Sequence, residues 1–486
     1  MGLGSILNIA RGAISAHQIA MQTVSQNIAN AEVEGYSRQR ADMQNAYAVQ
    51  FPQYTLGTGV EVRGISRMRD QLLDASYRRE VGNREAYNVR SDLLTEVESL
   101  LGEPSETGLA NTIDQFWNSW SDLSNNPGNA AAQGVVRQRG LQVAYTLNTY
   151  SKRVDDLTVR TRDHLSSVVT QLNTLAKQVG ALNRQITAAE VTGQQAPDLR
   201  DARDRVADEM AKLAGARVEM QANGSMGVYV GSMMLVDSDN ARTLEIRAAG
   251  SVTTMGLVGD PDPVIGVGGQ AGEMMKFVNT DVPALRTRLD SFAQGLVNGV
   301  NEYHASGWTA AGDALGGANW NPLNGPTGSR VNFFDASFTT ASTIRLSSEV
   351  TASASVIASG DVQNAPGNTS LATAIGALRD DAGMAALQAR MGANFATQIG
   401  FATGESFTDH YTSTVTGLGV DTADAQSQFA VYDTLTSQAD NRRTSVAGVS
   451  IDEELTLMLR HQQAYTAATR LVKVADEMAQ SILSMV

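Results

Sequence analysis

The 486-residue sequence contains no cysteine, which excludes disulfide bonds, thiolate catalysis and cysteine-ligated metals. Long hydrophobic runs are also absent, because no window approaches the roughly 18 uninterrupted apolar residues that a membrane-spanning helix needs. The first residues lack a basic cluster, and Asn8 and Arg11 interrupt their apolar stretch, so we expect no cleaved secretory signal peptide. A protein of this kind that leaves the cell must use another export route.

Basic residues and histidines are scarce. The 37 Lys and Arg residues against 51 Asp and Glu residues leave a formal net charge of -14, which argues against nucleic acid or an anionic membrane as a partner. The five histidines are scattered, and none lies at metal-ligand spacing from another histidine or a carboxylate. We therefore expect no metal, no cofactor and no catalytic centre.

The C-terminal stretch from Ser450 onward carries the clearest pattern of the chain. Its apolar residues recur at alternating steps of four and three, which is typical of a helix that wraps a partner helix. Ser450 and Glu453 form a capping-box pattern at its start. The stripe consists of Leu457, His461, Ala464, Ala468, Leu471, Ala475, Met478, Ile482 and Met485, of which only His461 is polar.

The N-terminal stretch shows the same alternation with the same single exception. Its stripe consists of Leu3, Leu7, Ala10, Ile14, His17, Met21, Val24, Ile28 and Ala31. We expect the two terminal helices to be partners. Since a helix with one narrow apolar stripe is only marginally stable alone, we also expect both ends to be largely unfolded in the monomer. They would fold when the stripes of neighbouring subunits meet.

Two polar features of these ends have alternative interpretations. His17 and His461 are either tolerated polar packing sites, or they meet across the helix pair and set its register, as buried polar residues do in coiled coils. The charged residues Glu34, Arg38 and Arg40 after the first helix belong either to a solvated loop or to a contact with a neighbouring subunit. The sequence leaves both choices open.

The interior divides by composition. From about residue 68 to 214 a helical period persists, and its apolar residues predict an antiparallel helical bundle. Roughly half of the 44 glycines lie between residues 215 and 367, where short alternating runs predict strands. The glycine-rich stretch 266–272 lacks the ending and the context of a phosphate-binding loop, so we interpret it as a flexible loop.

The sequence thus predicts a mainly α fold with a β-rich insertion: terminal coiled-coil helices, an elongated helical bundle and an outer Gly-rich β domain. A chain of this length favours two or more domains. The expected boundaries are residues 1–35 with 449–486 for the coiled-coil domain, 36–67 for a connector or small hairpin, 68–214 with about 272–306 and 371–445 for the bundle, and about 215–271 with 307–370 for the β domain.

Short motifs at both ends resemble the signatures of one family. The N-terminal motif runs from Ser25-Gln26-Asn27-Ile28-Ala29-Asn30 to Gly35-Tyr36-Ser37-Arg38-Gln39, and the C-terminal one includes 448–454, 462–465 and 475–478. They resemble the terminal motifs of the bacterial flagellar rod, hook and hook-associated axial proteins. The family turn motif falls on Asn27, Asn30, Gly35, Tyr36 and Arg38. Residues 108–127 and 198–204 are similar to the members of that family that join the hook to the filament.

The resemblance implies a non-enzymatic structural protein of the flagellum. It implies export through the flagellar type III apparatus to the outside of the cell, and terminal helices that form the inner coiled-coil layer of a tubular assembly. The implied partners are other copies of the chain, the hook protein, a second junction protein, and a cytoplasmic export chaperone on the C-terminal helix. Nucleic acid and membrane are not among them.

Other functions remain open at this stage. The chain could be another axial protein, such as a hook or distal-rod protein. It could be a surface adhesin that carries a carbohydrate-binding domain on a coiled-coil stalk. An enzyme in the Gly-rich insertion is the weakest alternative, because no nucleophile–base pair or paired carboxylates emerge there.

Overall fold

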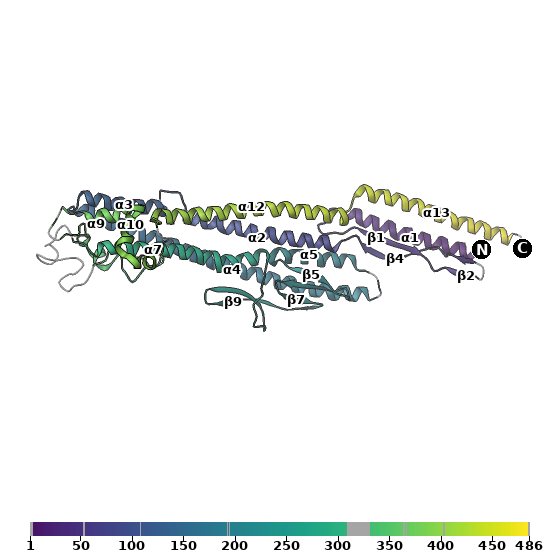
Figure 1. Ribbon diagram of the computed structural model, residues 1–486. Helices are drawn as coiled ribbons and strands as arrows, with labels where there is room; N and C mark the ends of the chain where they lie inside the picture. The colour runs from purple at the N-terminus through teal and green to yellow at the C-terminus, as the bar shows by residue number, and fades with distance from the viewer. Residues whose placement is uncertain are drawn as a thin grey trace.

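The structure is a computed structural model, and it describes residues 3–51, 54–106, 108–191, 193, 195–308, 331–362, 365, 367–401 and 404–484. The molecule is an elongated, mainly helical rod (Figure 1). Its longest helices in the interior of the chain, α2 (Gln71–Leu101), α4 (Ala130–Glu190) and α12 (Phe407–Ala447), run along the rod up to the part that carries the two termini. The chain runs out along the rod and returns, so both termini lie at the same end. None of the described helices has the length and apolar content to cross a membrane.

Capping residues set the ends of the long helices. The Asp70 side chain accepts hydrogen bonds from the backbone N–H groups of Leu72 and Leu73 at the start of α2, and Gly102 ends that helix at a φ of 59°. Asn129 caps α4 in the same way. A capping box between Ser406 and Asp409 starts α12. Helix α2 packs along α12, and α5 (Pro197–Ala214) packs against α2 and α4.

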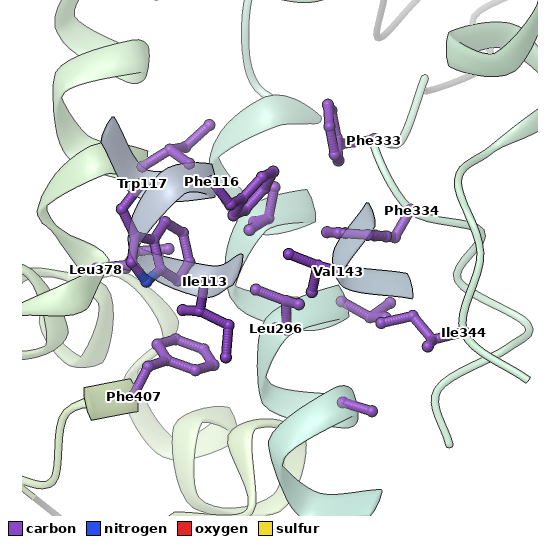
Figure 2. Close-up of a cluster of buried hydrophobic side chains, with 14 of the residues drawn as sticks. Ile113, Phe116, Trp117, Val143, Leu296, Phe333, Phe334, Ile344, Leu378 and Phe407 are labelled. Carbon is purple, nitrogen blue, oxygen red and sulfur yellow. The ribbon is translucent and has the colours of Figure 1, made fainter. Parts of the chain in front are cut away.

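The end of the rod away from the termini contains an aromatic cluster, which we call the distal core (Figure 2). Phe116, Trp117 and Trp120 are fully buried there and pack against Phe333 and Phe407. Burial of a large apolar side chain contributes about 1.5–3 kcal/mol, so this cluster is a main source of stability. Besides the end of α2 and the starts of α4 and α12, the contributing helices are α3 (Leu109–Asn125), α7 (Val282–His304), α8 (Ser348–Ala352), α9 (Ser370–Gly376), α10 (Asp381–Met391) and α11 (Phe395–Ile399).

The prediction that residues 307–370 belong to a β domain is wrong for the described part of this stretch. Residues 331–360 form short helices and isolated bridges, and they pack into the distal core. The alternation around Thr343-Ile344-Arg345-Leu346 arises because Ile344 and Leu346 insert into a helical core, while Arg345 faces solvent. Residues 309–330, which the same prediction covered, lie outside the described residues.

His304, at the end of α7, holds the irregular segment to the distal core. Its ring is fully buried, with Nδ1 3.1 Å from the Val331 carbonyl oxygen and Nε2 3.1 Å from the Ala358 backbone nitrogen. Nδ1–H therefore donates and Nε2 accepts, which requires the neutral ring. Burial lowers the pKa of His304 to about 4.

A β-containing module packs on the middle of the rod. Strands β5 (Arg217–Met220), β6 (Met226–Val230), β7 (Met233–Asp237) and β8 (Asn240–Ala241) form an antiparallel sheet in that order, and β9 (Leu244–Ala249) pairs with β10 (Val252–Leu257). Val228, Val230 and Met255 share a hydrophobic cluster with α4, α5 and α6 (Gly269–Lys276). A π-helical turn, Phe277–Asp281, joins α6 to α7.

The glycine-rich stretch 266–272 packs tightly where it meets α5. A Cβ on Gly269 would lie 2.5 Å from the Lys212 carbonyl oxygen, and the residue has a φ of +59°. A Cβ on Gly272 would lie 2.2 Å from the Val267 carbonyl oxygen. The glycines thus allow α6 to begin against the end of α5, and the flexible-loop interpretation is wrong from Gly269 onward.

At the end that carries the termini, a ribbon covers the first helix. Strand β1 (Gln39–Asn45) pairs with β4 (Val60–Arg67), and β2 (Val49–Phe51) pairs with β3 (Tyr54–Leu56). The ribbon packs on α1 (Leu3–Ala29), which also packs along α13 (Ile451–Leu483). Residues 36–67 are therefore a cover for α1 as well as a connector.

The distal core should lose stability in acid through His304. Since its folded pKa lies below its ordinary value of 6.5, the unfolded chain takes up the proton first, and stability present at neutral pH is lost as the pH falls toward 4. The expected loss is about 3 kcal/mol by pH 4. Denaturant unfolding followed by tryptophan fluorescence measures it. His304→Gln should be less stable at neutral pH and lack this step; equal pH dependence in both proteins would contradict the assignment.

Candidate functional site

The two terminal helices lie side by side and antiparallel at one end of the rod (Figure 1). We call α1 and α13 the terminal helix pair. The buried side chains in their contact are mostly small, among them Ala10, Ala20, Ala468 and Ala475. Small residues allow a close approach of the two backbones but bury little apolar area, so the pair is a narrow seam.

The predicted stripe is only partly used by this seam. Ala10, Val24 and Ala475 are buried, and Ile14, Met21, Ile28, Leu457 and Ala464 are half-buried. Leu7, Leu471 and Met478 remain 37%, 45% and 46% exposed. Leu3 and Ile482 lie in the helices, but their side chains, and all of Met485, are outside the described residues.

Helix α1 packs on other parts of its own chain, whereas we expected both ends of the chain to be largely unfolded in the monomer. Besides α13, it contacts the β1–β4 ribbon, where a Cβ on Gly12 would come 2.8 Å from the Val60 carbonyl oxygen. Gly59 approaches Ile9 in the same way. Gly12 and Gly59 are sequence features that could have indicated this close contact, but sequence reasoning missed them.

The two stripe histidines meet. Nδ1 of His17 lies 3.2 Å from Nδ1 of His461, and the ring centroids are 5.5 Å apart. Burial lowers the pKa of His17. Burial first, then the nearby His17 and Arg460, lower the pKa of His461, while Glu454 acts in the opposite sense. One ring must donate and the other accept, so the contact needs at least one neutral ring.

The buried Asn27 connects the family turn motif to both termini. Its Nδ2 donates to the Gln39 carbonyl oxygen at 2.8 Å and to Glu454 Oε2 at 2.9 Å. Its Oδ1 accepts from Gln39 N–H at 3.0 Å and from the Tyr36 hydroxyl at 2.8 Å. Burial, with Asp198 and Asp201 nearby, raises the pKa of Tyr36, so its hydroxyl stays a donor. All hydrogen-bonding capacity of the Asn27 amide is thereby used.

The other motif residues shape the turn. Arg38 donates to Glu454 Oε1 at 2.7 Å and to Glu453 Oε2 at 3.0 Å, and its backbone N–H donates to the Ala447 carbonyl oxygen at 2.8 Å. Asn30 donates to the Gln26 carbonyl oxygen within its own helix end. Gly35 has a φ of 75° and leaves no room for a Cβ beside the Arg205 side chain. The Arg38 contacts are therefore within the chain.

A cluster of buried charges ties this turn to the rod. We call Ser37, Arg67, Arg69, Arg78, Asp201 and Asp204 the ionic joint. Asp201 accepts from the Ser37 backbone N–H at 2.9 Å, from the Ser37 hydroxyl at 2.7 Å and from Arg67 at 2.6 Å. Asp204 pairs with Arg67 at 2.8 Å and Arg78 at 3.2 Å.

Asp204 is held ionised by its neighbours. Burial alone would raise its pKa, but Arg69, Arg67 and Arg78 together outweigh this, and the pKa of Asp204 is lowered. The segment 198–204 and the N-terminal turn, noted separately in the sequence, thus meet here. Sequence reasoning missed Arg67, Arg69 and Arg78, because no local pattern indicates which distant carboxylates an arginine will face.

The polar contacts of this site connect segments of the chain to one another. Its charges are paired, and nothing resembling a nucleophile with its base occurs among them. The described residues contain no group of three or more His, Asp or Glu that could hold a metal ion. The arrangement holds the terminal helix pair at one orientation relative to the rod.

Removing Asp201 should loosen the ionic joint. Asp201→Ala leaves the Ser37 N–H and hydroxyl without their buried acceptor and leaves Arg67 with Asp204 alone, which should cost about 3–5 kcal/mol. Denaturant unfolding and hydrogen exchange of residues 37–45 measure the loss. Asp155→Ala breaks an exposed pair with Arg286 and should cost less than about 1 kcal/mol. Similar losses in the two variants would contradict a structural role for the joint.

Acid should weaken the terminal helix pair. Both histidines have lowered folded pKa values, so stability present above their ordinary pKa of 6.5 is lost as the pH falls below it. Faster hydrogen exchange in α13 at pH 5 than at pH 7, corrected for intrinsic rates, would show this. His17→Asn/His461→Asn should remove the dependence. An unchanged dependence in that variant would rule out the histidine contact as its source.

Comparison with known proteins gives matches in three parts of the chain. Residues 94–319 match the helical domain of the flagellar hook-associated protein FlgK. Residues 443–485 match the C-terminal domain of the flagellar basal body rod proteins FlgEFG, and residues 7–36 match the flagella basal body rod protein family. The two terminal matches fall on the terminal helix pair.

Similar proteins span almost the whole chain. Flagellar hook-associated protein 1 of Bacillus subtilis is 26% identical over 521 residues, covering 98% of this chain and 97% of the relative. That of Escherichia coli is 24% identical over 550 residues, covering 99% and 100%. The solved flagellar hook junction protein FlgK of Burkholderia pseudomallei shares the fold, with a TM-score of 0.60 at 15% identity, covering 78% of this chain and all of that one. The chain belongs to the bacterial flagellar rod, hook and hook-associated axial proteins, and within them it is similar to hook-associated protein 1.

Proposed function

We propose that this protein joins the hook of the bacterial flagellum to its filament, through a second junction protein, and that it assembles by its terminal helix pair. One observation carries the proposal: the pair is folded within the chain, yet part of its apolar stripe stays uncovered. Leu471, Val474 and Met478 are 45%, 49% and 46% exposed and lie three and four residues apart, on one side of α13. A row of this kind fits a neighbouring helix.

Assembly of this kind makes a tube. A contact between one side of α13 and a different surface of the next copy is head-to-tail, and head-to-tail contacts that do not close generate helical arrays. The terminal helix pairs would form its inner layer. The ionic joint would then hold the rod and the β-containing module outside that layer.

The other proposed partners would bind to particular parts of this assembly or of the free protein. The hook protein would contact one axial face of the assembly, and the second junction protein the other. Before assembly the exposed apolar residues of α13, which include Leu455 and Leu459, need cover in the cytoplasm, and an export chaperone would supply it. Export through the flagellar type III apparatus would bring the protein to the cell exterior, and no catalysis is required there.

A charge in the exposed row should block assembly without unfolding the protein. Leu471→Asp or Met478→Asp places a carboxylate where a neighbouring helix would pack, so we expect at least about a ten-fold loss of the protein from isolated hook tips. Immunoblotting of hook preparations measures it, and circular dichroism checks the fold.

Two further variants make this test specific. Val159→Asp, at a 56% exposed position of α4, should assemble normally. Ala475→Asp, at a fully buried position of the pair, should instead disrupt α13 itself. Normal incorporation of both Leu471→Asp and Met478→Asp would exclude the exposed row as the interface.

A further inference from the structure

A large cleft lies beside the β-containing module and next to the ionic joint, since Arg67, Arg69, Arg78 and Asp204 are among its lining residues. Its volume is about 1160 Å³, and it is bounded by β5, by residues 71–83 of α2 and by the start of α5. Pockets for small ligands usually measure about 300–1,000 Å³, so this cleft has room for a segment of polymer.

One wall of the cleft is an open sheet edge. Strand β5 pairs with β6 on one side and with no described strand on the other. Gln221 donates its backbone N–H to Ser225 across the turn to β6, and bonded residues alternate along an antiparallel strand. Val218 and Met220 therefore direct their backbone N–H and C=O groups toward the cleft. An exposed edge of this kind is a template for an added strand.

The cleft is rich in arginine on a chain whose formal net charge is -14. Its lining contains seven arginines and three carboxylates, and four of the arginines, Arg67, Arg69, Arg78 and Arg200, already pair with carboxylates of the chain. Two of the other arginines can still donate hydrogen bonds to a ligand. Within the described residues, the side chain of Arg79, which is 69% exposed, pairs with the adjacent Glu80 alone, and Arg217 bonds the Gly231 carbonyl oxygen and has no carboxylate partner. Guanidinium groups suit the planar recognition of carboxylates.

Arg203 and Asp74 line the cleft, and each has one enclosed polar side-chain atom with no partner within the described residues. Arg203 is fully buried and bonds Asn183 and the Gly224 carbonyl oxygen, but its Nε has no acceptor. Asp74 pairs with Arg69 through Oδ2, while its Oδ1 has no donor.

We propose that this cleft binds an extended acidic segment of a neighbouring copy of the chain, which adds to β5 as a strand and sets its carboxylates against the arginines. Backbone hydrogen bonds to Val218 and Met220 supply the pairing, and Arg79 and Arg217 select acidic side chains. A neighbouring copy is the occupant because every copy is acidic and, in a tube, every copy repeats the same head-to-tail contact. The identity of the occupant rests on the proposed self-assembly, whereas the peptide-binding chemistry of the cleft does not.

Photo-cross-linking identifies the occupant. Tyr229 lines the cleft, and Tyr229→p-benzoylphenylalanine places a photoreactive ring there. Irradiated hook tips should yield a covalent dimer of this chain, with the cross-link on an acidic segment. Arg79→Glu/Arg217→Glu should reduce the yield about ten-fold, and Arg79→Lys/Arg217→Lys should largely preserve it. A product with another protein, no product, or a yield unchanged by the glutamates would overturn the proposal.

A binding assay on the purified full-length protein tests the cleft without assembly. Fluorescence anisotropy at low salt compares a peptide of about six alternating Glu and Val residues with its Lys and Val counterpart. The acidic peptide should bind at least about ten-fold more tightly, and Arg79→Glu/Arg217→Glu should abolish this preference. Equal binding of the two peptides, or displacement by inorganic phosphate at the peptide's own concentration, would overturn the strand-binding proposal. Absence of the protein from hook tips would refute the proposed junction role, while this assay would still decide what the cleft binds.

Discussion

The structure depends on one constraint: a chain that runs out along a rod and returns must hold its two ends to each other and to the rod. Two buried side chains meet this constraint. Asn27 bonds both backbone groups of Gln39 as well as Glu454, and Asp201 bonds the backbone and hydroxyl of Ser37. Buried polar groups are costly unless bonded, so these contacts permit only one arrangement of turn, terminal helix and rod.

The two ends of the molecule differ in how completely they are buried. The distal core encloses fully buried Trp117, Trp120 and Phe333 between several helices, and its stability comes from within the chain. The terminal helix pair is joined by a seam of small residues, which buries far less apolar area per residue. Leu471 and Met478 stay exposed beside that seam. One end is thus complete in a single copy, and the other can gain burial only from further molecules.

Much of this architecture could be predicted from local patterns. The alternation of Leu457, Ala464 and Ala475 identified a stripe on α13, and the short motif around Asn27 falls on the turn where Asn27 bonds Gln39 and Glu454. Residues 331–360 were predicted wrongly, because apolar residues that insert into a helical core from an irregular segment alternate much as strand residues do. The contact between His17 and His461 was one of two alternatives, since register across two distant helices is not encoded in either helix alone.

The sequence by itself determined the long helices, their apolar stripes, the motifs at both ends, and the absence of cysteine chemistry, since each depends on residues close together in the chain. Only the tertiary structure decided which charges meet. Arg67, Arg78 and Asp204 come from β4, α2 and α5, and their pairing follows from how those elements pack. The same holds for the cleft beside β5, whose walls come from distant segments. Polar groups that are distant in the sequence pair without any sequence period, so only the tertiary structure could show which of them meet.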